Sequence, residues 1–294
     1  MAGKRGMTIE RRKAVYGYIF VAPFAVGTLL FLLYPMIKSI QFSLSTYDNL
    51  TDLQAMRFVG IQNFVKAFTI DVEFVPKFLN VVRDMLINTP LVVLFSLILA
   101  ICLNKPMKGR AFFRTVFLLP FILGSGLIFK YMMFSGENEN AMVMVNGILT
   151  PPVIGRLFGD TVNQVFTVFL ERITLVLWKS GLQILLFLSG LQSIPDSLYE
   201  SARCDSATEW EMFWKITIPM MTPVILINIV YTIVDQFNDI NNAMMTYFEF
   251  TMMQMTRFDY AAAMSLIYMA FVLLTVGLVF LVMRRFVFYH SNRS

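Results

Sequence analysis

The sequence predicts an all-α membrane protein with six transmembrane helices, on three observations. Of the 294 residues, 57% are hydrophobic and only 15% are charged, whereas a soluble domain has roughly 45–50% apolar and about 25% charged residues. The apolar residues are gathered in runs of the length that crosses a bilayer as a helix, about 20 residues. The lysines and arginines lie mostly between these runs.

The six runs fall into two groups. Four contain no charged residue, and they cover 14–37, 85–104, 216–234 and 260–283. Two contain one lysine each, Lys130 in 115–134 and Lys179 in 173–195. The first run follows a basic segment, as in a secretory signal, but it is longer than the roughly 7–15 apolar residues of a cleaved signal. We therefore expect it to remain as the first span.

The distribution of basic residues predicts the orientation. Short cytoplasmic segments carry an excess of lysine and arginine. With the amino terminus inside, this excess falls on the tail, on the segment after 104, on the loop after 195 and on the segment after 283. We expect both termini in the cytoplasm, a basic tail over 1–13, one six-helix domain over 14–285 and a short tail over 286–294.

Composition excludes several classes of function. Cys102 and Cys204 are far apart and His290 is the one histidine, so neither a metal site nor histidine catalysis is indicated. The basic residues punctuate apolar runs instead of forming one water-facing surface, which argues against nucleic-acid binding. The chain has no G-x-x-x-x-G-K-[ST] phosphate loop. We expect no cofactor and no ATP hydrolysis in this chain.

The loop 193–219 stands apart from the spans because it is polar and of mixed charge. It reads SIPDSLYESARCDSATEWEMFWKITIP. Pro195 begins a predicted short helix over 197–203. Ser206 and Glu209 have the S-x-x-E spacing of a capping box, which predicts that Ser206 is the N-cap of a second helix. In that helix Trp210, Phe213, Trp214 and Thr217 would share one face.

This loop resembles the EAA loop of permease subunits in binding-protein-dependent ABC importers, whose pattern is E-A-A, three residues, G, nine residues, I-x-L-P. The spacing is met in full, Glu200 and Ala202 match, and Ile216 and Pro219 close the pattern. Three positions depart from it, with Ser201 for Ala, Ser206 for Gly and Ile218 for Leu. The segments GLQSIP at 190–195 and FVGIQNF at 58–64 look like the carbohydrate branch of that family.

The resemblance implies a type I, MetI-like ABC permease fold in a multi-pass protein of the cytoplasmic (inner) membrane of a prokaryote. It also implies that the loop contacts an ATPase. It implies four kinds of partner: two ATPase subunits that hold ATP and magnesium, a second and usually different permease chain, an extracytoplasmic solute-binding protein, and membrane lipid. The alternative is a loop that merely packs against its own helices. The residues implied in the ATPase contact are Glu200, Ser201, Ala202, Asp205, Ser206, Ala207, Glu209, Trp210, Ile216 and Pro219.

The fifth span carries a polar stripe. Asn228, Tyr231, Asp235 and either Asn238 or Asp239 follow the spacing of one helical face. Polar groups within a membrane are costly and often mark a pathway, and carboxylates, amides and a tyrosine ring suit a sugar. In the other interpretation, the two aspartates only mark the outer end of the helix.

Three further residues have two open interpretations. Lys130 and Lys179 fall in the outer halves of their spans, where a lysine can extend to the headgroups. If they face inward, they favour an anionic substrate such as an acidic saccharide or a glycerophosphate. Trp178 fits either an interfacial belt or a stacking platform for a sugar.

Two other classes of membrane protein fit less well. A secondary transporter driven by an ion gradient often shows inverted repeats and broken helices, and the sequence shows neither. A membrane enzyme needs paired carboxylates, histidines or metal-ligand spacings at catalytic depth, and the spans lack them. The sequence therefore predicts the permease of an ABC importer for a carbohydrate or oligosaccharide, with an anionic substrate as the alternative.

Overall fold

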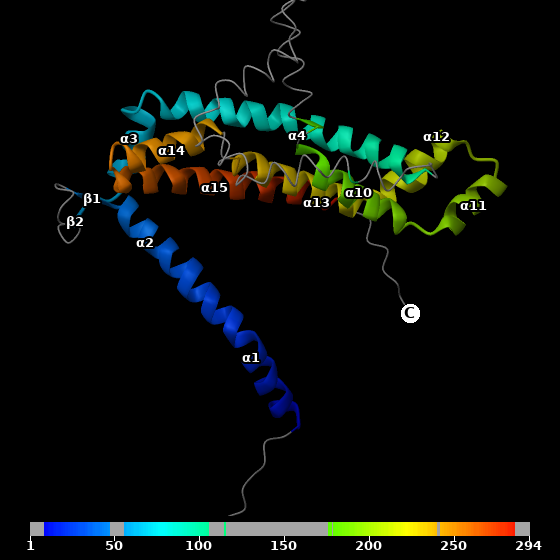
Figure 1. Cartoon of the computed structure of the whole chain (residues 1–294), viewed down its shortest axis with the longest axis horizontal. Coiled ribbons are helices and arrows are strands. Elements are labelled where there is room, and N and C mark those ends of the chain that lie inside the picture. Colours follow the sequence, from blue (N-terminus) through cyan, green and yellow to red (C-terminus); the bar gives the residue numbers. More distant parts are fainter. Residues whose placement is uncertain are drawn as a thin grey trace, which may run out of the picture. The chain divides into compact units, whose positions relative to one another are not determined.

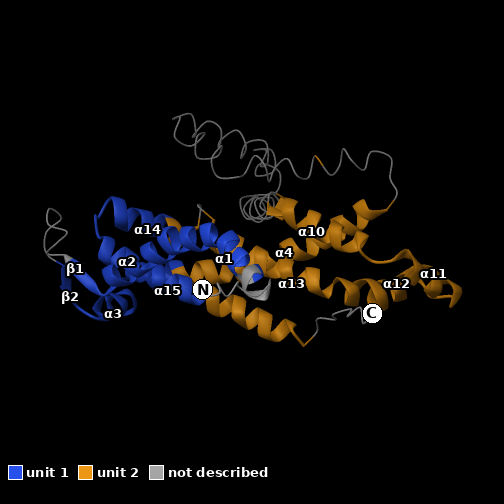
Figure 2. Ribbon diagram, turned by 90° about the horizontal axis from the view of Figure 1, so that it is seen from below, with its two compact units in different colours: residues 1–77, 246–271 blue, residues 78–245, 272–294 orange. Residues whose placement is uncertain are grey.

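The computed structural model describes residues 9–47, 56–105, 115, 176–177, 179–239 and 242–285. Figure 1 shows their helices, and Figure 2 colours two compact units, residues 1–77 with 246–271 and residues 78–245 with 272–294. The third predicted span beyond Thr115, the long segment 135–170, Lys130 and Trp178 lie outside the described residues.

Four described helical stretches are long and apolar enough to cross a membrane, and they coincide with the four uncharged runs. They cover Val15–Ser43, Phe74–Asn104, Glu209–Phe237 and Phe258–Met283. Three of them are clearly longer than the predicted runs because polar residues continue the helix beyond the apolar part. The described helix of the fourth predicted span is α10, which covers Gly181–Gln192.

The first span is helical throughout but changes pitch. It consists of α1 (Ile9–Thr28), a π-helical turn η1 (Leu29–Leu33) and α2 (Tyr34–Ser43). Pro35 lies just after the wide turn and has no N–H to donate to a preceding carbonyl, a common reason for a helix to depart from regular α geometry. Most of its apolar side chains are exposed within this chain, so their environment is lipid or another chain.

A short β-hairpin follows the first span, which the all-helical prediction did not include. Strand β1 (Ser45–Tyr47) pairs antiparallel with β2 (Met56–Phe58), with Thr46 opposite Arg57. Gly60 then adopts a φ of +63°, a conformation that glycine tolerates best. The Asn63 amide of α3 (Gln62–Thr69) donates to the carbonyls of Ser43 and Ser45 at 3.0 and 2.9 Å. Two three-residue strands carry too little periodic signal to be predicted.

The second unit holds three helices around one apolar core. These are α4 (Phe74–Asn104, of which the first four residues belong to the first unit), α10 and α13 (Ile218–Phe237). Lipid is as apolar as the side chains of such helices, so the hydrophobic effect does not drive the helices together. Close packing stabilises their association instead. A Cβ on Gly190 would lie 2.8 Å from Val224 Cγ2, so α10 and α13 approach closely there. The buried core residues are Val93, Leu97, Ala100, Leu103, Ile184, Phe187, Leu188, Leu191, Ile194 and Met221.

Two further helices lie near the carboxyl end. Helix α14 covers Ala243–Met253 and α15 covers Phe258–Met283. Within the first unit, the Phe248 and Tyr268 rings meet edge to face with their centroids 5.5 Å apart. The chain is therefore mostly helical in its described part, as predicted.

Candidate functional site

The loop 193–219 is built from two short helices and a π-helical turn. Helix α11 covers Asp196–Cys204, which confirms the predicted helix over 197–203 and extends it by one residue at each end. Helix α12 covers Glu209–Met212, and the π-helical turn η2 (Phe213–Thr217) joins it directly to α13. The loop thus continues into a membrane span without an interruption (Figure 1).

The N-cap prediction for Ser206 is wrong. Ser206 has a φ of +61°, which is the left-handed region. Its N–H donates to the Arg203 carbonyl at 3.0 Å, and the Ala207 N–H donates to the Ala202 carbonyl at 2.9 Å. These two bonds form a Schellman motif, in which the left-handed residue ends a helix by pairing its last carbonyls. Ser206 therefore ends α11, and the family pattern has glycine at this position because glycine adopts this conformation most readily.

The second helix begins with a capping box two residues later than predicted. Thr208 is its N-cap: the Glu211 N–H donates to Thr208 Oγ1 at 3.3 Å, and the Thr208 N–H donates to Glu211 Oε2 at 3.0 Å. The sequence contains both S-x-x-E at Ser206 and T-x-x-E at Thr208. Because Ser206 and Ala207 are already used to end α11, only the second pair is available to start α12.

Charged and aromatic side chains of the loop are turned outward. Arg203 of α11 pairs with Glu209 of α12 at 3.6 Å. Trp210 and Trp214 are 69% and 52% exposed, and their ring centroids lie 5.6 Å apart. Among the ten residues predicted to contact the ATPase, Glu200, Ser201, Asp205, Ser206, Glu209 and Trp210 are exposed, while Ala202, Ala207, Ile216 and Pro219 are half-buried.

Thr217 does not share the aromatic face, contrary to the prediction from α-helical spacing. Its side chain is buried, whereas Trp210 and Trp214 are exposed. The wider turn of η2, in which the Ile218 N–H donates to the carbonyl of Phe213 five residues earlier, changes the angular spacing along this stretch.

An ion triad of Lys179, Asp235 and Asp239 lies at the end of α13 that is far from Pro219. Lys179 Nζ lies 2.5 Å from Asp239 Oδ2 and 3.7 Å from Asp235 Oδ2, and the Lys179 side chain is only 13% exposed. Asn238 is exposed and caps the helix. The structure therefore groups Asp239, and not Asn238, with Asp235, and it holds Lys179 between carboxylates of its own chain.

A polar seam runs between α4, α10 and α13, and we use this name for Asn88, Gln183, Asn228, Thr232 and Gln236. Gln183 Nε2 donates to Thr232 Oγ1 at 3.3 Å, which donates to the Asn228 carbonyl at 2.7 Å. Asn88 Nδ2 lies 3.5 Å from Gln236 Oε1. Among the described residues, both amide atoms of the fully buried Asn228 have no partner, nor do Gln183 Oε1 and Gln236 Nε2.

The amide atoms of the seam without partners can donate to or accept from a hydroxyl-rich molecule or water. We expect such a partner because buried amides without hydrogen bonds are costly and rare. Asn228 is among the residues predicted from the sequence, whereas Gln183 and Gln236 are not. The signal that could have found them is the same one, an amide within an otherwise apolar run. Tyr231, also predicted in the stripe, is half-buried.

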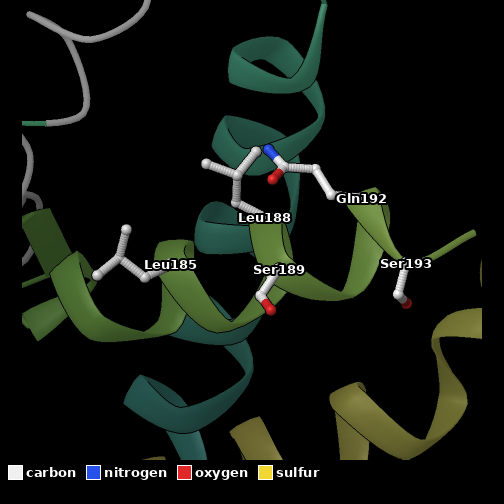
Figure 3. Close-up of a pocket in the computed structure, with 5 residues that line it drawn as sticks. All are labelled: Leu185, Leu188, Ser189, Gln192 and Ser193. Carbon is white, nitrogen blue, oxygen red and sulfur yellow. The ribbon is translucent and has the colours of Figure 1, made fainter.

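A shallow pocket of about 420 Å³ lies on α10 next to the start of the loop 193–219. Figure 3 shows its lining, Leu185, Leu188, Ser189, Gln192 and Ser193, which come from one end of α10 and the residue after it. Hydroxyl and amide groups there adjoin two leucines. The residues of this surface are not among those predicted from the sequence.

In the first unit, Asp71 collects hydrogen bonds from two tyrosines and from the start of α4. The Tyr260 and Tyr247 hydroxyls donate to Asp71 Oδ2, and the N–H groups of Glu73 and Phe74 donate to Oδ1. Burial alone raises the pKa of Asp71, but these hydrogen bonds outweigh it and the pKa lies below its usual value. No local sequence pattern predicts this cluster, because its members are far apart in the sequence.

Two cations cover the tyrosine rings of this cluster. Lys77 Nζ lies 4.0 Å from the centre of the Tyr247 ring, and Lys66 Nζ lies 4.8 Å from that of Tyr260. Burial lowers the pKa of Lys66, and burial together with the bond to Asp71 raises that of Tyr247. The cluster therefore links the start of α4 to α14 and α15 and has a structural role.

Comparison with known proteins identifies the family. Residues 72–293 match the family described as "Binding-protein-dependent transport system inner membrane component". The chain is 32% identical over 231 residues to the probable ABC transporter permease protein YesP of Bacillus subtilis, covering 77% of this chain and 72% of the relative. It is 30% identical over 227 residues to the lactose transport system permease protein LacF of Rhizobium radiobacter, covering 77% and 74%.

Solved structures have the same fold. A chain in the crystal structure of a bacterial alginate ABC transporter, in complex with an alginate pentasaccharide-bound periplasmic protein, matches with a TM-score of 0.65 and 20% identity, covering 94% of this chain and 96% of that one. The family match spans most of the chain, including the loop 193–219 and the helices on both sides of it. The chain therefore belongs to the inner-membrane components of binding-protein-dependent transport systems, the permease subunits of ABC transporters, and is a transporter subunit, not an enzyme.

Proposed function

We propose that this chain is the permease subunit of an ABC importer that passes a carbohydrate or oligosaccharide from a solute-binding protein across the cytoplasmic membrane of a prokaryote. The observation that carries the proposal is the family match over 72–293. The energy comes from the hydrolysis of ATP, which partner ATPase subunits bind together with magnesium.

The proposed topology has six spans with both termini in the cytoplasm. The four apolar helices support it, as does the excess of lysine and arginine on one side of the spans. In this topology the tail 1–13, the loop 193–219 and the tail 286–294 are cytoplasmic, and 14–285 is the six-helix domain. Since six spans form half of a pathway in this family, a second permease chain is required, and we expect a different one.

The loop 193–219 is the proposed contact with an ATPase subunit. Its two helices are fixed to each other by the Schellman motif at Ser206, the capping box at Thr208 and the pair of Arg203 with Glu209. Glu200 and Trp210 are exposed on the surface that these two helices form. A rigid surface with exposed aromatic rings and carboxylates suits a groove on another protein, because aromatic anchors contribute much of the energy of interfaces.

The polar stripe and the ion triad are the proposed lining of the substrate pathway. At about 1.5 Å per residue, Asn228 lies about 14 Å along α13 from Pro219, near the middle of a bilayer. The amides of the polar seam suit sugar hydroxyl groups. Relatives are named for the transport of lactose, a neutral sugar, and for that of sn-glycerol 3-phosphate, an anion.

The surroundings of Lys179 give no support to the anionic alternative. An anionic substrate needs a cation that is free to bind it, but of the two predicted lysines the one in the described part of the chain, Lys179, is held by Asp235 and Asp239. One lysine and two carboxylates carry a net charge of −1 when all are ionised, and this charge repels a carboxylate or phosphate. Lys130 and Trp178 lie outside the described residues and stay predictions.

The test is purification of the tagged chain from its native membrane, followed by uptake in proteoliposomes. We expect two ATPase subunits and a second permease chain to co-purify. With the cognate solute-binding protein and ATP, uptake of radiolabelled lactose, trehalose or arabinotriose should exceed that of sn-glycerol 3-phosphate. Uptake that needs an ion gradient and no ATP would contradict the importer, and preferred uptake of the phosphate would contradict the neutral substrate.

A further inference from the structure

The loop 193–219 contains a hydrogen bond that crosses from its first helix to the base of α13. The Tyr199 hydroxyl lies 2.9 Å from Thr217 Oγ1. Tyr199 is in α11, next to Glu200, and Thr217 is the last residue of η2. Thr217 is buried and Tyr199 is half-buried, whereas Glu200 is exposed. Neighbouring residues of α11 thus face opposite ways, Glu200 to the surface and Tyr199 to the body of the protein.

The bond lies beside the π-helical turn η2 and Pro219, where the regular α-helical geometry between the loop and α13 is lost. Sharp bends in helices occur at prolines and at π-helical turns. Pro219, two residues beyond Thr217, has no N–H to give to a carbonyl of that turn. Backbone bonds alone therefore leave α12 free to bend relative to α13 at this point.

The side chains compensate for this weakness. Thr217 Oγ1 also lies 3.4 Å from the Met212 carbonyl oxygen, to which the threonine hydroxyl can donate. If the Thr217 hydroxyl donates there, it accepts from Tyr199, and the chain of bonds joins α11, the end of α12 and the base of α13. Such chains strengthen one another in surroundings with little water. Tyr199, Ile216 and Ile218 also pack against the apolar core of α4, α10 and α13.

We infer that Tyr199 and Thr217 are positioning residues that make the loop and α13 move as one body, so that a displacement of the loop by an ATPase becomes a displacement of the membrane span. This inference rests on the proposed function, because it assumes that the loop is the ATPase contact. It adds a mechanical role to two residues that lie outside the predicted contact surface. Neither residue touches the ATPase or the substrate in this account; both act through the geometry of α13.

A distance measurement tests the rigid body without a transported sugar. Spin labels on Ser197→Cys of α11 and Ile227→Cys of α13, with Cys102 and Cys204 replaced by serine, report the distance between the two helices in the assembled complex. We expect the distance to stay the same between the nucleotide-free state and the state trapped with ATP and vanadate. In the Tyr199→Phe variant the distribution should broaden or shift. A wild-type distance that changes with nucleotide would overturn the inference.

The functional readout is the amount of radiolabelled saccharide moved per ATP hydrolysed. Loss of one neutral hydrogen bond should lower this ratio about two- to tenfold in Tyr199→Phe and in Thr217→Val, and the double variant should be no worse than either. Thr217→Ser keeps the hydroxyl and should keep the ratio. The matched control is Ser197→Ala, since the exposed Ser197 hydroxyl makes no side-chain hydrogen bond in the described part of the chain.

Two comparisons separate this inference from the proposed function. Equal ratios in Tyr199→Phe and Ser197→Ala, with a strong defect in Glu200→Lys, would overturn the positioning role and leave the ATPase contact in place. No defect in either Tyr199→Phe or Glu200→Lys would overturn both. Additive defects in the double variant would contradict a single shared bond.

Discussion

Lys179 Nζ lies 2.5 Å from Asp239 Oδ2, so a lysine just before α10 is paired with a carboxylate just after α13. Asp235, one turn earlier, is the second carboxylate of this triad, at 3.7 Å. An isolated charge within a membrane is expensive, and pairing is the usual solution. The triad therefore explains how the sequence can keep a charge at this position.

Removing Lys179 should destabilise the complex more than removing all three charges. Lys179→Met leaves two carboxylates close together without a cation. Because the triad is partly exposed, we expect a loss of about 1–3 kcal/mol, less than for a fully buried pair. The triple variant with Asp235→Asn and Asp239→Asn should regain most of it. Thermal unfolding of the purified complex measures both, and equal midpoints for Lys179→Met and wild type would show that the pairing contributes nothing.

Asn228→Leu should raise stability and lower transport. The Asn228 amide is buried without partners among the described residues, so replacing it with an apolar group of similar size relieves about 1–3 kcal/mol. If the amide contacts sugar hydroxyls, its loss should reduce uptake roughly five- to 150-fold. Tyr231→Leu should reduce uptake in the same assay.

The matched control for these two variants is Leu226→Val, which changes packing on α13 but not polarity. Uptake and thermal unfolding of all three are compared in the same assembled complex. If Asn228→Leu and Tyr231→Leu transport as well as Leu226→Val, the stripe is packing surface and the pathway assignment fails.

Ser206→Gly should stabilise the end of α11. A left-handed residue other than glycine costs roughly 1–2 kcal/mol, so glycine should gain about 1 kcal/mol, whereas Ser206→Ala should change little. An N-cap serine would behave in the opposite way, losing about 1 kcal/mol as alanine and a few tenths as glycine. Hydrogen exchange of the amides over 201–207 measures the local stability, and slower exchange in the glycine variant is the expected result.

The Asp71 cluster should weaken in acid. Because the folded-state pKa of Asp71 lies below its usual value near 3.8, its contribution to stability is fully present above that value and is lost as the pH falls through the lowered pKa. Asp71→Asn should therefore destabilise the protein at pH 7 and remove this part of the acid sensitivity. Parallel pH profiles of unfolding in the two proteins would contradict the assignment.

The sequence was enough to predict the features that depend on composition and on local spacing. The four uncharged runs became four long apolar helices, and the loop 193–219 contains the predicted helix over 197–203. The interpretation of Ser206 failed because two capping patterns overlap, and the choice between them depends on how α11 ends. Contacts such as Asp71 with Tyr260 or Gln183 with Thr232 join distant parts of the chain, and no local pattern reveals them.

The most direct test of the central claim is the coupling between ATP hydrolysis and uptake in the Glu200→Lys variant. Glu200 is exposed on α11 at the position that matches the family's motif, so charge reversal should break the contact with the ATPase without affecting insertion into the membrane. The control Asp196→Lys reverses an exposed charge on the same helix outside the motif. We predict that Glu200→Lys is present in the membrane at the wild-type level, with saccharide uptake abolished and ATPase activity no longer stimulated by the loaded solute-binding protein. Wild-type uptake and wild-type stimulation in Glu200→Lys would contradict the account.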